Sequence, residues 1–214
     1  MSMIKVMIVD DHPLVREGLK KVVSKGSMDI EVRYEASNAA EMQEMLSNEL
    51  PDIVILDIAM PGRSGMDVLK DIKNLYPELP VLMLSMHPED RFAVRAMKAG
   101  AAGYLTKTSI SDELVKAIRI IVTQKKRFIS PEVAEQLAMQ IDSSGQKSLH
   151  ETLSDREYQI LCMIASGKKI GDIAKELSLS VQTIHTYRAR LKDKMNMKSN
   201  VELARYAIQQ DLID

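Results

Sequence analysis

The first 125 residues alternate two hydrophobic patterns, and this alternation constrains the fold more than any other feature. Short runs rich in β-branched residues, such as Ile4–Val9 and Ile53–Leu56, are apolar nearly throughout, as strands buried on both faces are. The longer segments between them repeat apolar residues at helical spacing, as from Leu14 to Val23. Five strands alternating with five helices predict an α/β domain with a parallel, doubly wound sheet. The predicted strands are Ile4–Val9, Ile30–Ala36, Ile53–Leu56, Val81–Leu84 and Gly103–Leu105, and the later helices are Ala39–Leu50, Met66–Leu75, Phe92–Ala99 and Leu114–Val122.

The second half of the chain has no strand pattern. Ser130 and Pro131 form a helix-start signal, so Pro131–Ile141 is predicted to be a short helix, and Asp142–Ser148 has the composition of a linker. We expect a first domain at 1–125, a linker with one short helix at 126–151, and a small all-α domain at 152–214. The predicted helices of the last domain are Asp155–Ser166, Gly171–Leu177, Val181–Met195 and Asn200–Gln210.

Charge and cysteine content limit the class of protein. The formal net charge is -1, so any contact with nucleic acid requires a local basic patch. The single cysteine, Cys162, cannot form an internal disulfide, which fits a reducing compartment. No apolar run approaches the ~18–20 residues of a membrane span, and the first residues lack the pattern of a signal peptide. We therefore expect a cytoplasmic protein without a membrane partner.

Polar side chains follow four of the predicted strands. Asp10 and Asp11 follow the first, Asp57 the third, Ser85 the fourth and Lys107 comes two residues after the fifth. In a parallel sheet these positions share one edge, near the point where strand order reverses. Neighbouring carboxylates repel one another unless a cation neutralises them, and oxygen ligands suit Mg²⁺. One carboxylate could then attack a phosphoryl group, with the lysine and the serine hydroxyl stabilising its oxygens.

Two alternatives remain open from these residues alone. A single aspartate at a strand end is ordinarily a helix cap or a solvated turn residue, so the argument depends on the full set. An aspartyl-nucleophile phosphatase on a similar sheet is the other alternative, which turnover of a phosphomonoester would favour. Phosphatases of that class usually have Asp-x-Asp after the first strand, whereas Asp10 and Asp11 are adjacent. A P-loop nucleotide site is disfavoured because its glycine-rich signature is absent.

Four segments resemble the receiver domain of response regulators: Val9–Pro13, Leu56–Gly62, Ser85 and Tyr104–Lys107. The whole chain resembles the NarL/FixJ type of that family. The resemblance implies a flavodoxin-like fold, Asp57 as the phosphoacceptor and a sensor histidine kinase as the phosphodonor. It further implies that the receiver assists only its own phosphorylation and dephosphorylation, so we expect no enzyme acting on an external substrate. A degenerate receiver that works without phosphate is disfavoured by the complete set of site residues.

The same resemblance assigns roles to the remaining site residues. Asp11, Asp57 and the backbone carbonyl of Ala59 would bind Mg²⁺, with Asp10 acting through water. Lys107 would contact the phosphoryl group, and Ser85 and Tyr104 would form a switch pair. We expect His12 and His87 to be loop residues rather than metal ligands, because Mg²⁺ prefers oxygen.

The C-terminal domain carries a concentrated positive charge on one predicted helix. Ile170, Ile173, Ala174 and Leu177 form one buried stripe, and the chain then turns at Leu179–Ser180 into the next helix. Between Val181 and Lys198 five lysines and arginines face one aspartate, a net charge of +4. A solvated basic helix face is the plain alternative, but this pattern is also the electrostatic footprint of a major-groove reader.

The segment from Leu153 to Leu191 resembles the LuxR-type helix-turn-helix. The resemblance implies a phosphorylation-promoted homodimer on double-stranded DNA, paired through Asn200–Gln210. Base-facing positions would be His185, Thr186 and Ala189, and Ala189 can make only an apolar contact, for instance with a thymine methyl. Gln182 and Thr183 complete the expected reading set, and Arg188, Arg190, Lys192 and Lys194 would contact phosphates.

Overall fold

The computed structural model describes residues 3–85, 89–142, 148–210 and 212–213 of the 214-residue chain. It divides into two compact units, Met1–Asp142 and Ser143–Asp214. Among the described residues no helix is both long and apolar enough to cross a bilayer.

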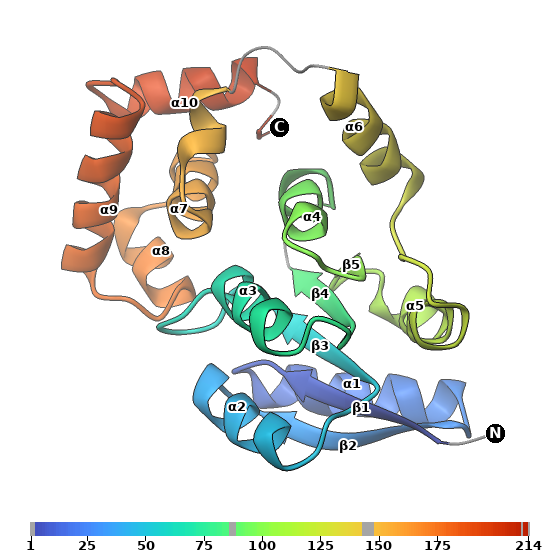
Figure 1. The fold of residues 1–214 in the computed structure, drawn as a ribbon. Coiled ribbons are helices and arrows are strands. Elements are labelled where there is room, and N and C mark those ends of the chain that lie inside the picture. Colours follow the sequence, from blue (N-terminus) through green and yellow to red (C-terminus); the bar gives the residue numbers. More distant parts are fainter. Residues whose placement is uncertain (1–2, 86–88, 143–147, 211, 214) are drawn as a thin grey trace. The chain divides into compact units, whose positions relative to one another are not determined.

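The first unit is built on a five-stranded parallel sheet (Figure 1). Its strands are β1 (Ile4–Val9), β2 (Ile30–Ala36), β3 (Ile53–Asp57), β4 (Val81–Ser85) and β5 (Gly103–Thr106), in the order β2-β1-β3-β4-β5. Every residue of β3 and β4 is buried, as their unbroken apolar runs predict. The predicted sheet is confirmed, and strand order reverses between β1 and β3, where ligands bind in such sheets.

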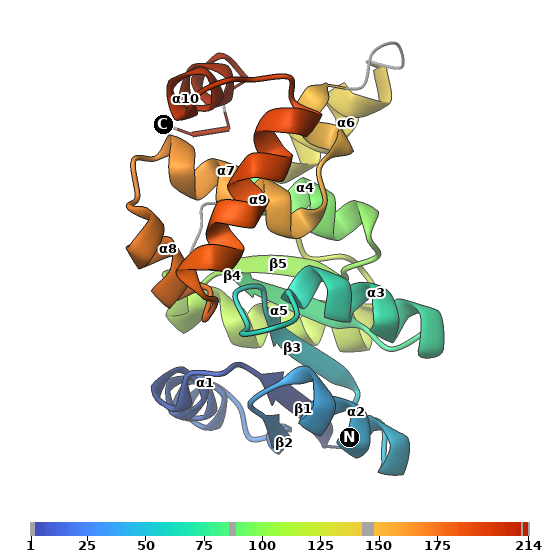
Figure 2. The ribbon, with the colours of Figure 1, turned by 90° about the vertical axis from the view of Figure 1, so that its left-hand side faces the viewer.

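Helices cover both faces of this sheet. The core on one face joins alternate strand residues to Leu19 and Val23 of α1 (Pro13–Gly26) and to Leu114, Ala117 and Ile118 of α5 (Ile110–Gln124). Right-handed crossovers place the other three helices on the opposite face. These helices are α2 (Ala39–Asn48), α3 (Gly65–Leu75) and α4 (Glu89–Lys98) (Figures 1 and 2).

The segment after α5 extends the sheet. The backbone N–H of Phe128 donates to the carbonyl of Ala102 (2.9 Å), and the N–H of Tyr104 donates to the carbonyl of Phe128 (3.2 Å). Phe128 therefore pairs in parallel with Gly103 at the free edge of β5. Helix α6 (Pro131–Asp142) follows and packs against α4, and it ends one residue beyond the predicted helix. The domain limits expected from the sequence stay a prediction, and residues 143–147 of the expected linker lie outside the described part of the chain.

The second unit consists of a short 3₁₀ turn, η1 (Leu149–Thr152), and four helices. These helices are α7 (Asp155–Ala165), α8 (Ile170–Glu176), α9 (Val181–Lys194) and α10 (Asn200–Gln209). Serine side chains cap three of them, with Ser154, Ser180 and Ser199 accepting from backbone N–H groups of the first turn. The all-α prediction is confirmed, with each helix ending within one residue of the predicted position.

Gly103→Ala tests the pairing of Phe128 with β5. An added Cβ would lie 2.8 Å from the Phe128 carbonyl oxygen and 2.9 Å from Leu82 Cδ1. We expect the free energy of unfolding, measured with urea, to fall by about 1–3 kcal/mol. The matched control is Gly18→Ala in the middle of α1, where a Cβ meets nothing within 4 Å. It should gain about 0.5–1 kcal/mol. Equal stability of Gly103→Ala and the unaltered chain would contradict the pairing.

Candidate functional site

The carboxyl ends of the strands carry a buried polar cluster. Asp10 directly follows β1, whereas Asp57 and Ser85 are the last residues of β3 and β4, and each of the three is 1% exposed. Lys107 directly follows β5, and its side chain is 9% exposed. The sheet therefore brings these four predicted site residues to one edge.

Lys107 joins the two buried carboxylates. Its ammonium Nζ lies 2.7 Å from Asp10 Oδ2 and 3.1 Å from Asp57 Oδ1. Its backbone N–H donates to the carbonyl of Ser85 at 2.7 Å, which ties the end of β5 to the end of β4. One cation thus faces two carboxylates at the centre of the cluster, so the cluster is under-neutralised.

Four side chains of this edge could share one cation. Asp10, Asp11, His12 and Asp57 each offer one ligand atom, and these atoms all lie within 4.8 Å of one another. Both carboxylate oxygens of Asp57, and Oδ1 of Asp11, are buried without a well-aligned hydrogen bond among the described residues. The geometry and the mainly oxygen donor set fit Mg²⁺. The acidic cluster is therefore consistent with Mg²⁺ binding.

Asp10 is held in place from three directions. The backbone N–H of His12 donates to Asp10 Oδ1 (2.8 Å), Lys107 donates to Oδ2 (2.7 Å), and Arg16 Nη1 donates to the Asp10 carbonyl oxygen (2.7 Å). His12 also places Nδ1 2.9 Å from Asp11 Oδ1. His12 lies in the loop between β1 and α1, beside the cluster, and the expectation that it is not a metal ligand stays a prediction. His87 lies outside the described residues.

A glycine allows α3 to begin beside Asp57. A Cβ on Gly65 would lie 2.0 Å from the backbone oxygen of Asp57, and the Gly65 N–H donates to the carbonyl of Ile58 at 2.9 Å. Ser64 caps the same helix by accepting from the N–H of Met66 at 3.2 Å. Ala59 lies in the short loop thus formed, and the expected role of its carbonyl stays a prediction.

The expected switch pair lies in the sheet. Tyr104 is 1% exposed and sits in β5 opposite Met83 of β4, and Ser85 is opposite Thr106. Both side chains are therefore part of the packed interior. Their switch role stays a prediction.

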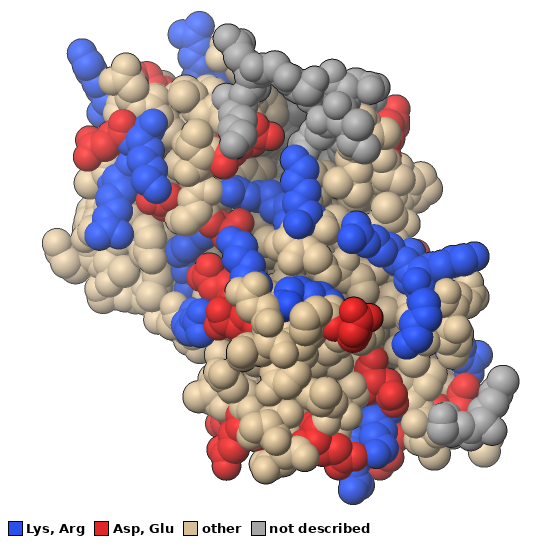
Figure 3. All heavy atoms as spheres, in the orientation of Figure 1, with Lys and Arg blue, Asp and Glu red and all other residues tan. Residues whose placement is uncertain are grey.

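Helices α8 and α9 form the predicted helix-turn-helix. Ser178 takes a left-handed conformation (φ 50°) in the turn, and Ser180 accepts from the N–H of Thr183 at 3.0 Å to start α9. Ile184, Leu191 and Met195 are at most 1% exposed and point into the unit. The predicted DNA-contacting side chains are exposed or half-buried: Gln182, Thr183, His185, Thr186, Arg188, Ala189, Arg190, Lys192 and Lys194. Lysine and arginine side chains gather over α9 in the space-filling view (Figure 3).

Lys194 has a partner within its own unit. Its ammonium donates to Glu157 Oε2 at 2.7 Å, and the same oxygen accepts from the Ser154 backbone and hydroxyl at 2.9 Å each. The ion pair ties the end of α9 to the start of α7. The predicted contact of Lys194 with phosphate is untested.

Comparison with known proteins covers both units. Residues 6–119 match the family described as response regulator receiver domain, and residues 151–207 match bacterial regulatory proteins of the luxR family. The response regulator GacA of Pseudomonas aeruginosa is 38% identical over 99% of both chains. This chain belongs to the response-regulator family. The response regulator UvrY of Escherichia coli K12 is 37% identical, over 98% of this chain and 96% of UvrY.

A solved complex of the response regulator RcsB with DNA is similar in structure. The TM-score is 0.59 at 25% identity, and the match covers 96% of this chain and 98% of that one. Receiver and luxR-type domains together make this response regulator a phosphorylation-dependent transcription regulator. The family and fold predicted from the sequence are confirmed.

Burial sets the electrostatics of the receiver site in this response regulator. Desolvation raises the pKa of Asp57 to about 6, the Asp10 carboxylate adds to the rise, and the Lys107 ammonium opposes it. Burial alone would lower the pKa of Lys107, but the carboxylates of Asp57 and Asp10 raise it above its ordinary value. The lysine thus stays charged, while the ionised Asp57 is held in an unfavourable environment.

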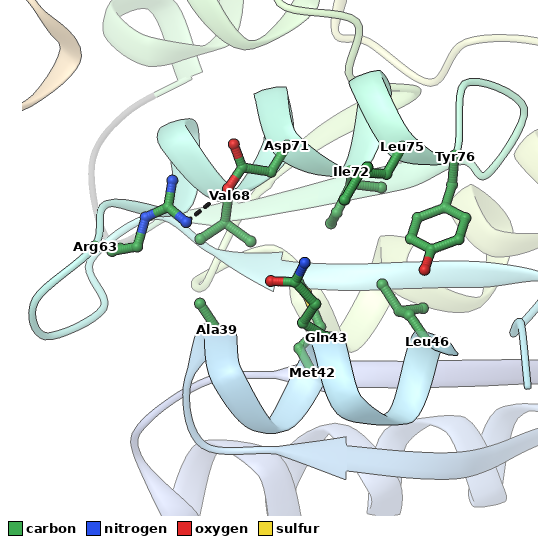
Figure 4. A pocket seen from close by; sticks show the side chains of 10 residues that line it. All are labelled: Ala39, Met42, Gln43, Leu46, Arg63, Val68, Asp71, Ile72, Leu75 and Tyr76. Atoms are coloured by element: carbon green, nitrogen blue, oxygen red, sulfur yellow. Dashed lines mark ion pairs between the residues drawn. The ribbon is translucent and has the colours of Figure 1, made fainter. Parts of the chain in front are cut away.

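A pocket in the receiver unit lies between α2 and α3 (Figure 4). Its walls are mainly apolar, and an ion pair between Arg63 and Asp71 (2.6 Å) stands at one end. It lacks the carboxylate and lysine arrangement of the strand edge. It is lined by Ala39, Met42, Gln43, Leu46, Arg63, Val68, Asp71, Ile72, Leu75 and Tyr76.

Asp57→Asn tests the cost of the buried carboxylate. Because the folded-state pKa of about 6 lies above the ordinary 3.8, ionisation of Asp57 opposes folding. The penalty grows as pH rises through this interval and is constant above it. In urea denaturation at pH 7.5 with EDTA, Asp57→Asn should be about 1–3 kcal/mol more stable than the unaltered chain. The gain should shrink at pH 5.

The control for that experiment is Glu31→Gln, which alters an exposed carboxylate of β2. Its stability should change little at either pH. A gain for Asp57→Asn that does not depend on pH would be inconsistent with a raised pKa.

Proposed function

We propose that Asp57 of this response regulator accepts a phosphoryl group from a sensor histidine kinase, and that the modified chain binds promoter DNA as a dimer. The observation that carries the proposal is the contact of one buried ammonium, Lys107, with both Asp10 and Asp57. Such an arrangement stabilises the negative charge of a transferred phosphoryl group beside the carboxylate that receives it.

The phosphoryl transfer needs only the kinase phosphohistidine and the Asp57 carboxylate as reactants. A carboxylate oxygen of Asp57 attacks phosphorus, the P–N bond of the kinase phosphohistidine breaks, and the imidazole leaves with the bonding electron pair. The Lys107 ammonium contacts a phosphoryl oxygen, and the Ser85 hydroxyl donates to another. Mg²⁺, held by Asp11, Asp57 and the Ala59 carbonyl with Asp10 acting through water, would neutralise part of the phosphoryl charge.

The same residues provide a switch. Ser85 and Lys107 are joined through the backbone hydrogen bond between the ends of β4 and β5. A phosphoryl group on Asp57 draws both side chains toward it, and the packing around Tyr104 in β5 changes in response. The displacement then favours the dimeric, DNA-binding state.

DNA binding is assigned to α9 and dimer formation to α10. Arg188, Arg190, Lys192 and Lys194 contact phosphates. The expected reading set, Gln182, Thr183, His185, Thr186 and Ala189, faces the bases. Val201 and Ile208 of α10 are 77% and 57% exposed, and their seven-residue spacing puts them on one face. These apolar side chains are the surface proposed to pair with a second copy.

Loss of the acceptor carboxylate should abolish phosphorylation. Incubated with acetyl phosphate and Mg²⁺, the Asp57→Asn chain should incorporate no phosphate, measured as the absence of the phosphorylated species in intact-protein mass spectra. Its DNA affinity should not respond to the phosphodonor. Asp112→Asn, at an exposed position of α5, is the control and should be phosphorylated normally. Phosphate that is retained on Asp57→Asn would overturn the assignment, and steady turnover of a phosphomonoester would favour a phosphatase.

Replacing a lysine or arginine that contacts phosphate should weaken DNA binding by the same factor for every DNA sequence. For Arg190→Ala and Lys192→Ala we expect the slope of log affinity against log salt to become less negative by about 1 each. This slope is measured by fluorescence anisotropy between about 50 and 200 mM salt. One selected duplex and one random duplex are compared. Lys25→Ala in α1 is the control and should leave the slope unchanged. An effect restricted to one sequence would instead indicate base contact.

A further inference from the structure

The outward face of α9 has an uncharged strip with basic side chains on either side of it. The face opposite Ile184, Leu191 and Met195 is centred on Gln182, Thr186 and Ala189, which follow one another at i, i+4 and i+7. All three are exposed and uncharged. At 100° per residue, Arg190 and Lys194 flank this strip on one side, and His185 and Lys192 flank it on the other.

This distribution matches the major groove of a duplex. Flanking cations suit the phosphates on either wall, and the neutral strip between them suits the floor where base edges lie. Asp193 lies on the same outward face but in the last turn of α9. A recognition helix contacts base edges with its N-terminal residues, so the first three turns decide what is read.

The hydroxyl of Thr186 is already engaged. Its Oγ1 donates to the carbonyl of Gln182 at 3.1 Å, so its proton serves the helix backbone. The hydroxyl of Thr183 is likewise engaged, 2.8 Å from Ser180 Oγ at the start of the helix. What Thr186 offers to a partner is therefore chiefly its methyl group, one turn from the methyl group of Ala189.

We propose that Thr186 and Ala189 form a methyl strip that recognises thymine methyl groups, so that α9 selects A·T pairs. This inference rests on the proposed DNA binding by α9 and names what that helix reads. Thymine alone presents a methyl group in the major groove, and apolar side chains contact it. Gln182, in the same strip, suits the N6 and N7 positions of adenine. Guanine is read mainly by Arg or Lys, which this strip lacks.

The size of the effect follows from the buried methyl group. Removing one methyl from such a contact loses about 0.8 kcal/mol. Since 1.4 kcal/mol corresponds to a factor of ten, the expected loss is about fourfold for each thymine, and about sixteenfold when both half-sites are changed.

The test starts with the full-length chain treated with acetyl phosphate and Mg²⁺. Binding sites are selected from a random duplex library, and the best duplex is then synthesised with deoxyuridine replacing one thymine at a time. Deoxyuridine keeps the hydrogen bonds of the A·T pair and lacks only the methyl group. We expect at least one position in each half-site where this replacement weakens binding about fourfold, whereas replacements outside the half-sites have no effect.

Two variants identify the protein side of the contact. Thr186→Val keeps the methyl group and removes the hydroxyl, so it should keep both the affinity and the sensitivity to uracil. Thr186→Ser keeps the hydroxyl and removes the methyl group in both subunits of the dimer, so it should bind the thymine duplex about sixteenfold more weakly and lose the sensitivity at one position in each half-site. Both changes are on an exposed helix face and leave the core intact.

The possible outcomes distinguish a failure of the methyl-strip proposal from a failure of the proposed DNA-binding function. Equal binding of thymine and uracil duplexes at every position overturns the methyl strip and leaves DNA binding standing. Loss of affinity in Thr186→Val but not in Thr186→Ser also overturns it, because the hydroxyl would then be the recognised group. Failure to enrich any sequence, with or without the phosphodonor, overturns the proposed function itself.

Discussion

The receiver unit depends on one electrostatic imbalance at the edge of its sheet. Asp10 and Asp57 are almost fully buried, and among the described residues they face one ammonium group, that of Lys107. Buried charges that lack full compensation cost several kcal/mol, and only a rigid surrounding structure can hold them together. The fully buried strands β3 and β4 provide that rigidity, and Gly65 and Arg16 hold the neighbouring backbone. An imbalance of this kind favours the binding of a group that supplies positive charge, and the acidic cluster is consistent with Mg²⁺.

Much of this edge could be predicted because parallel strands have a simple signature. Strands buried on both faces appear as unbroken apolar runs, and their carboxyl ends share one edge by geometry. The convergence of Asp10, Asp57 and Lys107 followed from that rule. The apolar runs placed the ends of β3 and β4 one residue too early. Both strands keep their backbone pairing through the polar residues Asp57 and Ser85, after the apolar pattern has stopped.

The contacts that could not be predicted join residues without any periodic relation. The approach of α3 to the Asp57 carbonyl requires a glycine at position 65, yet a glycine in sequence does not say which atom it avoids. The pairing of Lys194 with Glu157 couples positions far apart in the chain, whereas the sequence indicated only a contact of this lysine with phosphate. The engagement of the Thr186 hydroxyl is local, but it depends on a rotamer that periodicity does not specify.

The pairing of Phe128 with the edge of β5 has a mechanical consequence. Tyr104 lies in the strand that leads to Lys107, and its own N–H donates to the Phe128 carbonyl. A displacement of β5 must therefore either move Phe128 with it or break that hydrogen bond. In both cases the backbone that leads into α6 is held differently at its start. The segment that follows α5 is thus tied by one β-bridge to the strand that ends beside Lys107, so motion of that strand and motion of the segment leading into α6 are coupled.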